Sequence, residues 1–562
     1  MKSSLHPALP ITKSLLSFNI MSPLRHLSHS LSAALVVAFP LNAISHAETS
    51  TVAIYDLEGV ISENGISSGS MFSMDLDARR PLTFFDLATS LQKAAADPDV
   101  AALVMEADDA VLSMAQSEEI RRHLLAARTA GKDVWLYSDH YHNQSALLGS
   151  AATHFSLNPE ADVNFTGMLV ESLYFKDMLD KIGVLADVIH IGDFKSFGEE
   201  FYRRGPSEFA ARQTETLISD LFTRVTQKIA AGRDISAKKV VEYIDRGHFT
   251  ANEAREAGFV NQLTSRTAFN RSVRTSYPDA DFDHGYELPE RDGPKIDGFL
   301  DVFKLMLDSG KSDSGKSPYV AVVALDGAIS KMSITPVRDE IIRLMRDDNA
   351  AALVLRVNSP GGSALASEIL WETTDQWRAS GRPLAVSMGG VAASGGYYVA
   401  ASADRIFAEN TTLTGSIGVV GMKFVMADAM DKLGITTHTT QRGEYANLMS
   451  MTQPFDEAQE KLVRHSMREV YGTFKKRIQD GRGDRLQNDL EALAGGRVYT
   501  GKRALKHGLI DELGGITDAI DWAAKQANLE TPRAKLFPEP QSPLEGMFST
   551  PEREPEDELV RT

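Results

Sequence analysis

The sequence predicts an α/β fold that is built twice along the chain. Segments rich in apolar and β-branched residues alternate with helical segments, an order typical of parallel βαβ units. Segments of the first half also recur about 250 residues later: DKIGV at 180–184 returns as DKLGI at 431–435, and AALVME at 101–106 returns as AALVLR at 351–356. Self-similarity at one offset indicates a tandem duplication.

The elements of the two copies can be placed in chain order. Each copy opens with a strand, continues through a helical stretch to a second strand, and through another helix to a third. A longer helix follows further along each copy. The predicted strands lie at 52–61, 100–107 and 133–138 in the first copy and at 320–329, 351–357 and 383–388 in the second; the long helices lie at 206–232 and 456–482.

Composition divides the chain into five parts. A polar run of Ser, Gly, Lys and Asp at 308–318 indicates a flexible join between the copies. The tail from Phe537 onward is rich in Pro and Glu, and we expect it to be disordered. The predicted parts are a signal segment at 1–47, a first copy at 50–300, a linker at 301–318, a second copy at 319–537 and an acidic tail at 538–562.

The N-terminus predicts export. Basic residues precede an apolar segment at 31–44, and small residues follow at Ser45 and Ala47, the pattern of a secretory signal cleaved after Ala47. The same pattern is complete when the chain is read from Met21, so either methionine is a candidate start. The apolar segment contains Pro40 and is shorter than the ~20 residues of a bilayer span. An uncleaved membrane anchor is the alternative.

Composition also bounds the class of protein. With 43% hydrophobic and 24% charged residues, the chain is typical of a soluble globular protein. A net charge of −17 argues against nucleic acid or an anionic membrane surface as the main partner. The absence of cysteine excludes disulfides, thiolate catalysis and cysteine-ligated metal. We expect neither a metal nor another cofactor.

Two residues are informative because each has a reactive side chain at a position where the other copy has a residue that cannot do the same chemistry. In the register of the repeat, Ser394 corresponds to Asn143, and Lys195 corresponds to Ala446. The second copy therefore keeps a nucleophile, and the first copy keeps a base. A working site must be assembled across both copies.

Ser394 is predicted to lie between a strand with its Gly-Gly turn and a helix of small residues. Free N–H groups and the positive dipole end of a helix favour developing negative charge, so the N–H of Gly395 is a natural oxyanion donor. A second donor is expected from the turn at 356–363, where Gly361 and Gly362 allow close approach of a carbonyl. The alternative is that both glycine-rich turns only end strands of the sheet.

A serine nucleophile needs a base, and no histidine lies near these C-terminal motifs. Lysine can serve when it is neutral, which requires surroundings that lower its pKa from ~10.4. Lys195 lies between Phe194 and Phe197, a suitable apolar setting. A solvated surface lysine is the alternative. Three acidic neighbours would raise the pKa of Lys195 if they faced it: Asp193, Glu199 and Glu200.

These motifs together resemble one family. In a duplicated layout, the chain carries SPGG at 359–362, AASGGYY at 392–398, TGSIGV at 414–419 and GDFKS at 192–196. This combination is similar to the long tandem form of the signal peptide peptidase A family, also called protease IV. The similarity covers nearly the whole chain after residue 50.

The resemblance implies a fold and a set of site residues. The family's fold resembles that of the Clp-protease and crotonase superfamily, which is built from spiral ββα units. Its Ser/Lys dyad corresponds to Ser394 as nucleophile and Lys195 as general base, and its lysine-orienting serine corresponds to Ser416. Its oxyanion donors correspond to Gly362 and Gly395.

The resemblance also implies a function. Members of the family are exported serine endopeptidases that degrade cleaved signal peptides and similar small apolar peptides without a cofactor. They are usually bowl-shaped homotetramers at the outer face of the inner membrane, so we expect a periplasmic homo-oligomer. This chain departs from the family where a long N-terminal anchor is expected, which leaves inner-membrane attachment as an alternative to a free periplasmic form.

Two other functional classes are compatible with the same turns. A crotonase-like enzyme of acyl-CoA thioesters would use them as its oxyanion hole, although the export signal and the Ser/Lys pairing count against it. A catalytically inactive scaffold protein is the second class. The first copy, with Asn143 in the nucleophile position, is already a half-domain without a nucleophile.

Overall fold

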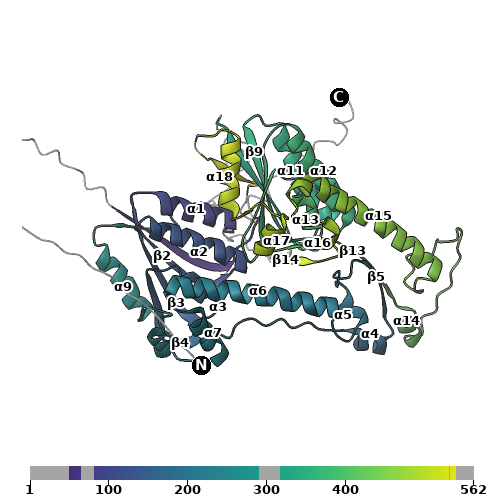
Figure 1. Ribbon diagram of the computed structural model, residues 1–562, viewed down its shortest axis with the longest axis horizontal. Coiled ribbons are helices and arrows are strands. Elements are labelled where there is room, and N and C mark those ends of the chain that lie inside the picture. The colour runs from purple at the N-terminus through teal and green to yellow at the C-terminus, as the bar shows by residue number, and fades with distance from the viewer. Residues whose placement is uncertain (1–49, 65–80, 290–316, 531, 540–562) are drawn as a thin grey trace, which may run out of the picture. The chain divides into compact units, whose positions relative to one another are not determined.

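The structure is a computed structural model that describes residues 50–64, 81–289, 317–530 and 532–539 (Figure 1). The predicted signal segment, nearly all of the predicted linker and nearly all of the predicted tail lie outside these residues, and the domain boundaries stay predictions. Among the residues that are described, no helix combines the length and the apolar character needed to cross a bilayer.

The first copy forms a six-stranded sheet in the order β6-β4-β3-β2-β1-β7, and all neighbouring strands are parallel. Parallel neighbours require crossover connections, which the helices supply. The elements of this copy are β1 (Thr51–Val60), α1 (Phe84–Ala96), β2 (Val100–Val111), α2 (Met114–Thr129), β3 (Asp133–Tyr141), α3 (Asn143–Gly149), β4 (His154–Val163), α4 (Lys176–Ile182), β5 (Leu185–Ile191), α5 (Glu199–Tyr202), α6 (Glu208–Arg233), α7 (Ala237–Arg246), α8 (Ala251–Glu256), β6 (Gln262–Leu263), α9 (Arg266–Ser276) and β7 (Asp281–His284).

The second copy forms an eight-stranded sheet with the path β14-β12-β10-β9-β8-β16; β11 also pairs with β10, and β15 pairs with β11. Only the pair β12–β14 is antiparallel among the described strands of this sheet. The elements are β8 (Tyr319–Asp326), α11 (Lys331–Met345), β9 (Ala350–Ser359), α12 (Ala364–Ala379), β10 (Leu384–Ala393), α13 (Gly395–Ala400), β11 (Arg405–Ala408), β12 (Leu413–Gly415), β13 (Val419–Val425), α14 (Ala427–Lys432), α15 (Glu457–Arg482), the 3-10 helix η1 (Gly483–Arg485), α16 (Leu490–Leu493), β14 (Val498–Thr500), α17 (Gly501–His507), β15 (Glu512–Leu513), α18 (Ile516–Gln526) and β16 (Ala534–Phe537).

The predicted α/β class is confirmed, and the predicted strands and long helices correspond to β1–β3, β8–β10, α6 and α15. One detail is wrong. The pair Gly389–Gly390 does not end the strand but lies within β10, where the pairing with β9 shifts its register. Asn358 of β9 lies at the shift: a Cβ on Gly389 would lie 2.9 Å from the Asn358 Cβ, and Asn358 Oδ1 accepts the Val391 N–H at 3.2 Å.

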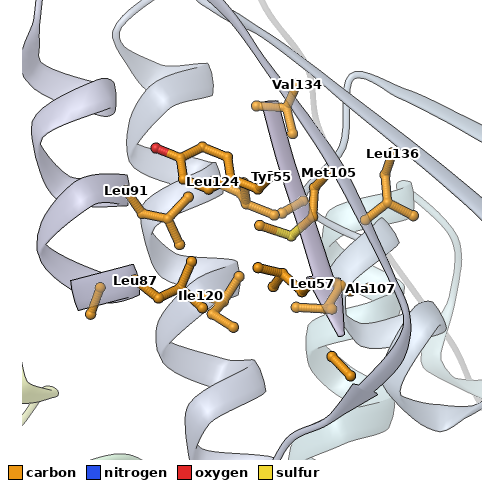
Figure 2. Packing of buried hydrophobic residues seen from close by; sticks show 14 of the residues in the cluster. Tyr55, Leu57, Leu87, Leu91, Met105, Ala107, Ile120, Leu124, Val134 and Leu136 are labelled. Carbon is orange, nitrogen blue, oxygen red and sulfur yellow. The ribbon is translucent and has the colours of Figure 1, made fainter. Parts of the chain in front are cut away.

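The two copies share part of their apolar core. Figure 2 shows Tyr55 and Met105 of the first sheet facing Leu91 of α1 and Leu124 of α2. The same cluster continues into the second copy through residues of its sheet and of α18: Val320, Val322, Val354, Ala519 and Ile520. Apolar packing, and not the linker alone, therefore joins the copies.

A two-stranded antiparallel sheet also joins the copies. It pairs β5 of the first copy with β13 of the second in unbroken register, from Leu185 opposite Val425 to Ile191 opposite Val419. Figure 1 shows the two strands together with α4, α5 and α14 near one end of α6. The pair positions the candidate site, because β5 runs into the loop that carries Lys195 and β13 follows closely after Ser416.

Candidate active site

Ser394 lies at the sharp turn between β10 and α13. It is the N-cap residue of that helix, with φ 52° and ψ −118°, a conformation that residues other than glycine rarely adopt. Its N–H donates to Gly415 O at 2.8 Å, which ties the turn to the end of β12. Strained backbone of this kind persists only where the surrounding structure fixes it, and it clusters at functional sites.

Lys195 reaches Ser394 from the other copy. Its ammonium nitrogen lies 3.0 Å from Ser394 Oγ, 2.9 Å from Ser416 Oγ and 3.0 Å from Ser416 O. The side chain comes from the loop between β5 and α5, and the residue is only 7% exposed. The structure thus brings the predicted nucleophile, base and orienting serine within hydrogen-bond distance of one another.

Burial lowers the pKa of Lys195 from 10.5 to about 8. Its acidic neighbours in sequence do not oppose this effect. Glu199 and Glu200 each accept a backbone N–H of their own segment, at 2.7 and 3.0 Å, and Asp193 is exposed. In the part of the chain that the structure describes, no carboxylate forms an ion pair with this ammonium. Lys195 therefore loses its proton at a lower pH than an ordinary lysine.

The environment of Lys195 differs in part from the expectation. Phe194 is packed edge to face against another phenylalanine, but Phe197 is 60% exposed, because the chain turns between the two rings. A pair of glycines from the second copy packs against the backbone of the lysine loop. Phe194 N–H donates to Gly495 O at 2.9 Å, and a Cβ on Gly496 would lie 2.3 Å from the backbone nitrogen of Lys195. Sequence reasoning missed this pair, although a Gly-Gly step before a strand was a visible signal.

Ser416 holds the lysine from the end of β12. It has φ 54° and follows Gly415, which has φ 88°, so two successive left-handed residues turn the chain sharply. The Ser416 N–H donates to Arg497 O at 2.6 Å, which fixes the turn against β14. A buried amine needs hydrogen-bond partners, and Ser416 supplies two of the three that Lys195 has.

The turn between β9 and α12 lies directly behind Ser394. A Cβ on Gly361 would lie 2.7 Å from the Ser394 Cβ, and one on Gly362 would lie 2.1 Å from a backbone oxygen, so neither position accepts a side chain. The Gly361 N–H donates to a serine hydroxyl of its own turn at 3.1 Å. No acceptor among the described residues takes the N–H of Gly362 or of Gly395. These two donors are the ones predicted for the oxyanion.

The equivalent positions of the first copy carry different chemistry. Asn143, in the position of Ser394, donates from its side chain to a backbone carbonyl at 2.6 Å. Val111 and Leu112 stand where the second copy has its glycine pair, and the conformation and space of that pair exclude such side chains. In the lysine position of the second copy, Ala446 is exposed. Within the described residues, the complete arrangement therefore forms once, from both copies.

A buried lysine beside a serine, on a duplicated α/β fold, is the arrangement of a serine-type peptidase in which lysine takes the place of histidine. The model of Peptidase family S49 matches the chain twice, at residues 126–276 and 376–530. These matches cover more than half of the sequence, and the protein belongs to peptidase family S49. The predicted family and the predicted duplication are both confirmed.

Similar proteins occur in plants and bacteria. "Serine protease SPPA, chloroplastic" of Arabidopsis thaliana is 30% identical over 80% of this chain and 66% of that protein. "Protease 4" of Salmonella typhi is 28% identical over 85% of this chain and 78% of its own, and "Protease 4" of Haemophilus influenzae is 29% identical over 80% and 74%. These matches favour the peptidase over the acyl-thioester enzyme.

Proposed function

We propose that this peptidase is an exported endopeptidase that uses Ser394 and Lys195 as a catalytic dyad to degrade signal peptides and similar small apolar peptides. One observation carries the proposal. The Lys195 nitrogen lies 3.0 Å from Ser394 Oγ, and burial lowers its pKa to about 8. A lysine in that state can accept the proton of a hydroxyl near neutral pH.

In the first step, Ser394 Oγ attacks the carbonyl carbon of the peptide, and neutral Lys195 takes the hydroxyl proton. The two oxygens of Ser416 hold the amine in line with Ser394 throughout this transfer. When the carbon–nitrogen bond breaks, the Lys195 ammonium gives the proton to the leaving amine. An ester of Ser394 remains, and the lysine is neutral again.

The tetrahedral intermediate carries its negative charge on the former carbonyl oxygen. The free N–H groups of Gly362 and Gly395 are the donors for this oxyanion, from the glycine turn and from the start of α13 respectively. Such donors contribute because they are already in place before charge develops. In the last step, Lys195 takes a proton from water, the resulting hydroxide attacks the ester, and Ser394 Oγ leaves with a proton returned by the lysine.

The surroundings of the glycine turn favour an apolar substrate. Leu365 follows the turn directly in α12 and is 71% exposed, and Met332 in the first turn of α11 is 85% exposed. The segment before α11 pairs with the turn through the bridge between Ile329 and Gly362. Exposed apolar side chains beside oxyanion donors are a suitable surface for the apolar core of a signal peptide.

Location and assembly follow from the sequence and belong to the same proposal. The N-terminal signal pattern supports export to the periplasm, with attachment to the inner membrane as the variant in which the segment is not cleaved. The family resemblance supports a homotetramer.

A labelled fluorophosphonate tests the proposal. Wild-type protein should be modified at Ser394, as located by peptide mass spectrometry, and should cleave a synthetic signal peptide. Ser416→Ala should still be modified at Ser394, and Ser394→Ala should not be modified. Turnover of an acyl-CoA thioester without peptide cleavage would support the crotonase-like alternative, and absence of both activities and of labelling would support the scaffold.

A further inference from the structure

A basic pocket lies where the first copy packs against the second. It is a hollow of about 620 Å³ between α6 of the first copy and α17 of the second, and Figure 1 shows α17 close to α6. The residues that give the pocket its charge are Asp220, Arg224, Lys502, Arg503, Lys506 and His507. Basic residues therefore outnumber acidic ones here, in a chain whose net charge is −17.

Three cations of the pocket have no anion beside them. In the part of the chain that the structure describes, Lys502, Arg503 and Lys506 form no ion pair with a carboxylate. Lys506 follows the other two by four and three positions, so all three share one face of α17. Like charges at this spacing destabilise a helix, and a bound anion removes the repulsion between them.

The carboxylate that lines the pocket is already engaged. Asp220 Oδ1 lies 3.2 Å from Arg224 Nη2, and the other oxygen of Asp220 accepts the Thr500 hydroxyl. Arg224 is only partly used by this pair, because its Nε is buried and has no hydrogen-bond partner among the described residues. A buried donor without an acceptor is uncommon. An anion in the pocket would supply an acceptor.

His507 shows the same excess of positive charge. Burial lowers the pKa of its imidazole, and the nearby Arg503 and Lys506 lower this pKa further. The Asn488 side-chain nitrogen lies 3.2 Å from His507 Nδ1, which a neutral ring can use as an acceptor. The ring is therefore neutral near pH 7, and the charge of the pocket comes from its lysines and arginines.

The first copy provides an internal comparison for α17. Its counterpart is α8, because FTANEAREAGFVNQL at 249–263 matches YTGKRALKHGLIDEL at 499–513. The positions of Lys502, Arg503, Lys506 and His507 are occupied in the first copy by Asn252, Glu253, Glu256 and Ala257. The same helix thus forms in the same place without these basic residues, so the fold does not require them.

Two of the basic residues also oppose the local preference of the helix. In α8, Glu253 completes a capping box with Thr250, and a carboxylate suits the positive end of the helix dipole. In α17, Thr500 accepts the Arg503 N–H at 3.4 Å, but Arg503 has no acceptor with which to complete such a box. Lys502 lies in the same first turn. Residues that break a local rule in this way are expected at functional sites.

We propose that the basic pocket binds a phosphate monoester, either a small soluble one or the headgroup of a lipid. A phosphate monoester carries about two negative charges near neutral pH and has three terminal oxygens, so it can meet several cations at once. The guanidinium groups of Arg224 and Arg503 are suited to paired hydrogen bonds with phosphate oxygens, while Lys502 and Lys506 act as point charges. A single carboxylate would leave most of these cations unpaired. The site consists of side chains and does not depend on the backbone of α17.

This inference goes beyond the proposed function and is independent of it. The strand β14 separates the two sites: Arg497 precedes β14 and its carbonyl accepts the Ser416 N–H, whereas Thr500 ends β14 and caps α17. The residues of the pocket are distinct from those of the dyad and of the glycine turn. A binding experiment can therefore succeed or fail whatever the outcome for the Ser/Lys chemistry.

Two binding measurements on the full chain distinguish the sources of the phosphate. Isothermal titration calorimetry with glycerol 3-phosphate tests a soluble ligand. Co-sedimentation with phosphatidylcholine vesicles, with and without phosphatidic acid, tests a lipid headgroup that presents the same phosphate monoester. Binding in either arm should weaken as salt is added, because ions screen the charges.

A charge reversal taken from the first copy tests the residues. Arg503→Glu with Lys506→Glu gives α17 the charges of α8 and a capping carboxylate, so we expect it to fold and to keep fluorophosphonate labelling of Ser394. Its phosphate binding should be at least about 10-fold weaker than that of the wild type. The matched control, Arg271→Glu with Arg274→Glu, makes the same change in net charge at the same spacing on the exposed face of α9. It should bind within about 2-fold of the wild type at physiological salt.

Each outcome decides the proposal. A loss confined to the pocket variant supports it, and the arm in which the loss occurs identifies a soluble ester or a lipid headgroup. No binding by the wild type in either arm, or equal binding by the pocket variant and the control, would overturn it. If the pocket variant loses Ser394 labelling, Arg503→Gln with Lys506→Gln replaces it, and this variant should also bind more weakly than the control. Loss of labelling in the wild type would contradict the proposed function and leave the binding result standing.

Discussion

Arg356 of the second copy and Glu63 of the first form a doubly hydrogen-bonded ion pair. Arg356 Nε lies 2.9 Å from Glu63 Oε2, and Nη2 lies 3.1 Å from Oε1. The two side chains are 1% and 3% exposed. Arg356 lies on β9, the strand that runs into the glycine turn, while Glu63 follows β1. The pair therefore ties the copy that supplies the lysine to the strand that leads into the glycine turn with its proposed oxyanion donor.

Loss of this pair should destabilise the whole molecule. Glu63→Ala leaves a buried guanidinium without its hydrogen-bonded carboxylate and with Glu119 at 3.8 Å as a more distant neighbour, and breaking a buried pair in this way costs about 3–5 kcal/mol. We expect the free energy of unfolding in urea to fall by that amount. The double variant Glu63→Ala with Arg356→Met should recover part of the loss, since the guanidinium is removed together with its hydrogen-bonded carboxylate, while the buried Glu119, 3.8 Å from Arg356 Nη1, loses this neighbour. A fall below about 1 kcal/mol in Glu63→Ala would contradict the role assigned to the pair.

Ser394→Ala should abolish peptide cleavage and leave the fold intact. Only a hydroxyl is lost, from a residue whose backbone is held by the Gly415 carbonyl. We expect kcat to fall by about 10⁴-fold or more, with an unchanged circular dichroism spectrum and unfolding midpoint. Ser380→Ala, at the C-cap of α12, serves as the matched control and should keep full activity. Substantial cleavage of a peptide ester by Ser394→Ala would end the assignment of Ser394 as nucleophile.

Much of the fold and the site could be predicted from the sequence because the duplication supplies its own comparison. Strands at the same offset in both copies gave the α/β class, and the exchange of Ser394 for Asn143 singled out the position of a nucleophile. The sequence also predicted that Lys195 acts on Ser394 from the other copy, because the first copy has no serine at the nucleophile position and the second has no lysine at the base position. The structure then placed the two side chains within hydrogen-bond distance.

Other features depend on contacts between residues far apart in sequence. The backbone at Lys195 packs against Gly495 and Gly496, some 300 positions away, while its neighbour Phe197 faces solvent. The side chain of Asn358 packs against Gly389, which lies inside a strand where the sequence indicates a turn. Local propensity cannot report such contacts, because they arise only when the two copies are packed together.

Ser416→Ala should lower kcat more than it changes KM. The variant removes the hydroxyl, one of the two acceptors that residue 416 offers to the lysine amine. The backbone carbonyl of residue 416, 3.0 Å from the amine, stays in place. The amine is then less well oriented during proton transfer, for which we expect a loss of about 10- to 100-fold in kcat. Steady-state kinetics on a peptide substrate would separate the two parameters. Covalent labelling of Ser416 with Ser394 untouched would reverse the roles of the two serines.

The rate should rise with pH through the pKa of Lys195. With a pKa of about 8, about one tenth of this lysine is neutral at pH 7 and about nine tenths at pH 9. The free-enzyme parameter kcat/KM should therefore increase nearly tenfold per pH unit below pH 8 and level off near pH 9. Lys195→Arg should be inactive at every pH in this range, because a guanidinium does not give up its proton. A flat profile from pH 6 to 9 would exclude Lys195 as the general base.

The same pKa should appear in the stability of the protein, which gives a measurement independent of catalysis. The Lys195 pKa is about 8 in the folded chain and 10.5 as the ordinary value, so between these values the unfolded chain binds more protons than the folded one. Stability must then rise with pH over this window. Lys195→Met has no proton to exchange at this position and serves as the reference.

We expect the wild type to gain about 2 kcal/mol relative to Lys195→Met between pH 7 and pH 9.5. The free energies of unfolding of both proteins, measured in urea at the two pH values, give this difference directly. Groups other than Lys195 titrate alike in the two proteins and cancel. A difference that does not change with pH would mean that Lys195 keeps an ordinary pKa when folded, and a lysine with that pKa is too rarely neutral to serve Ser394.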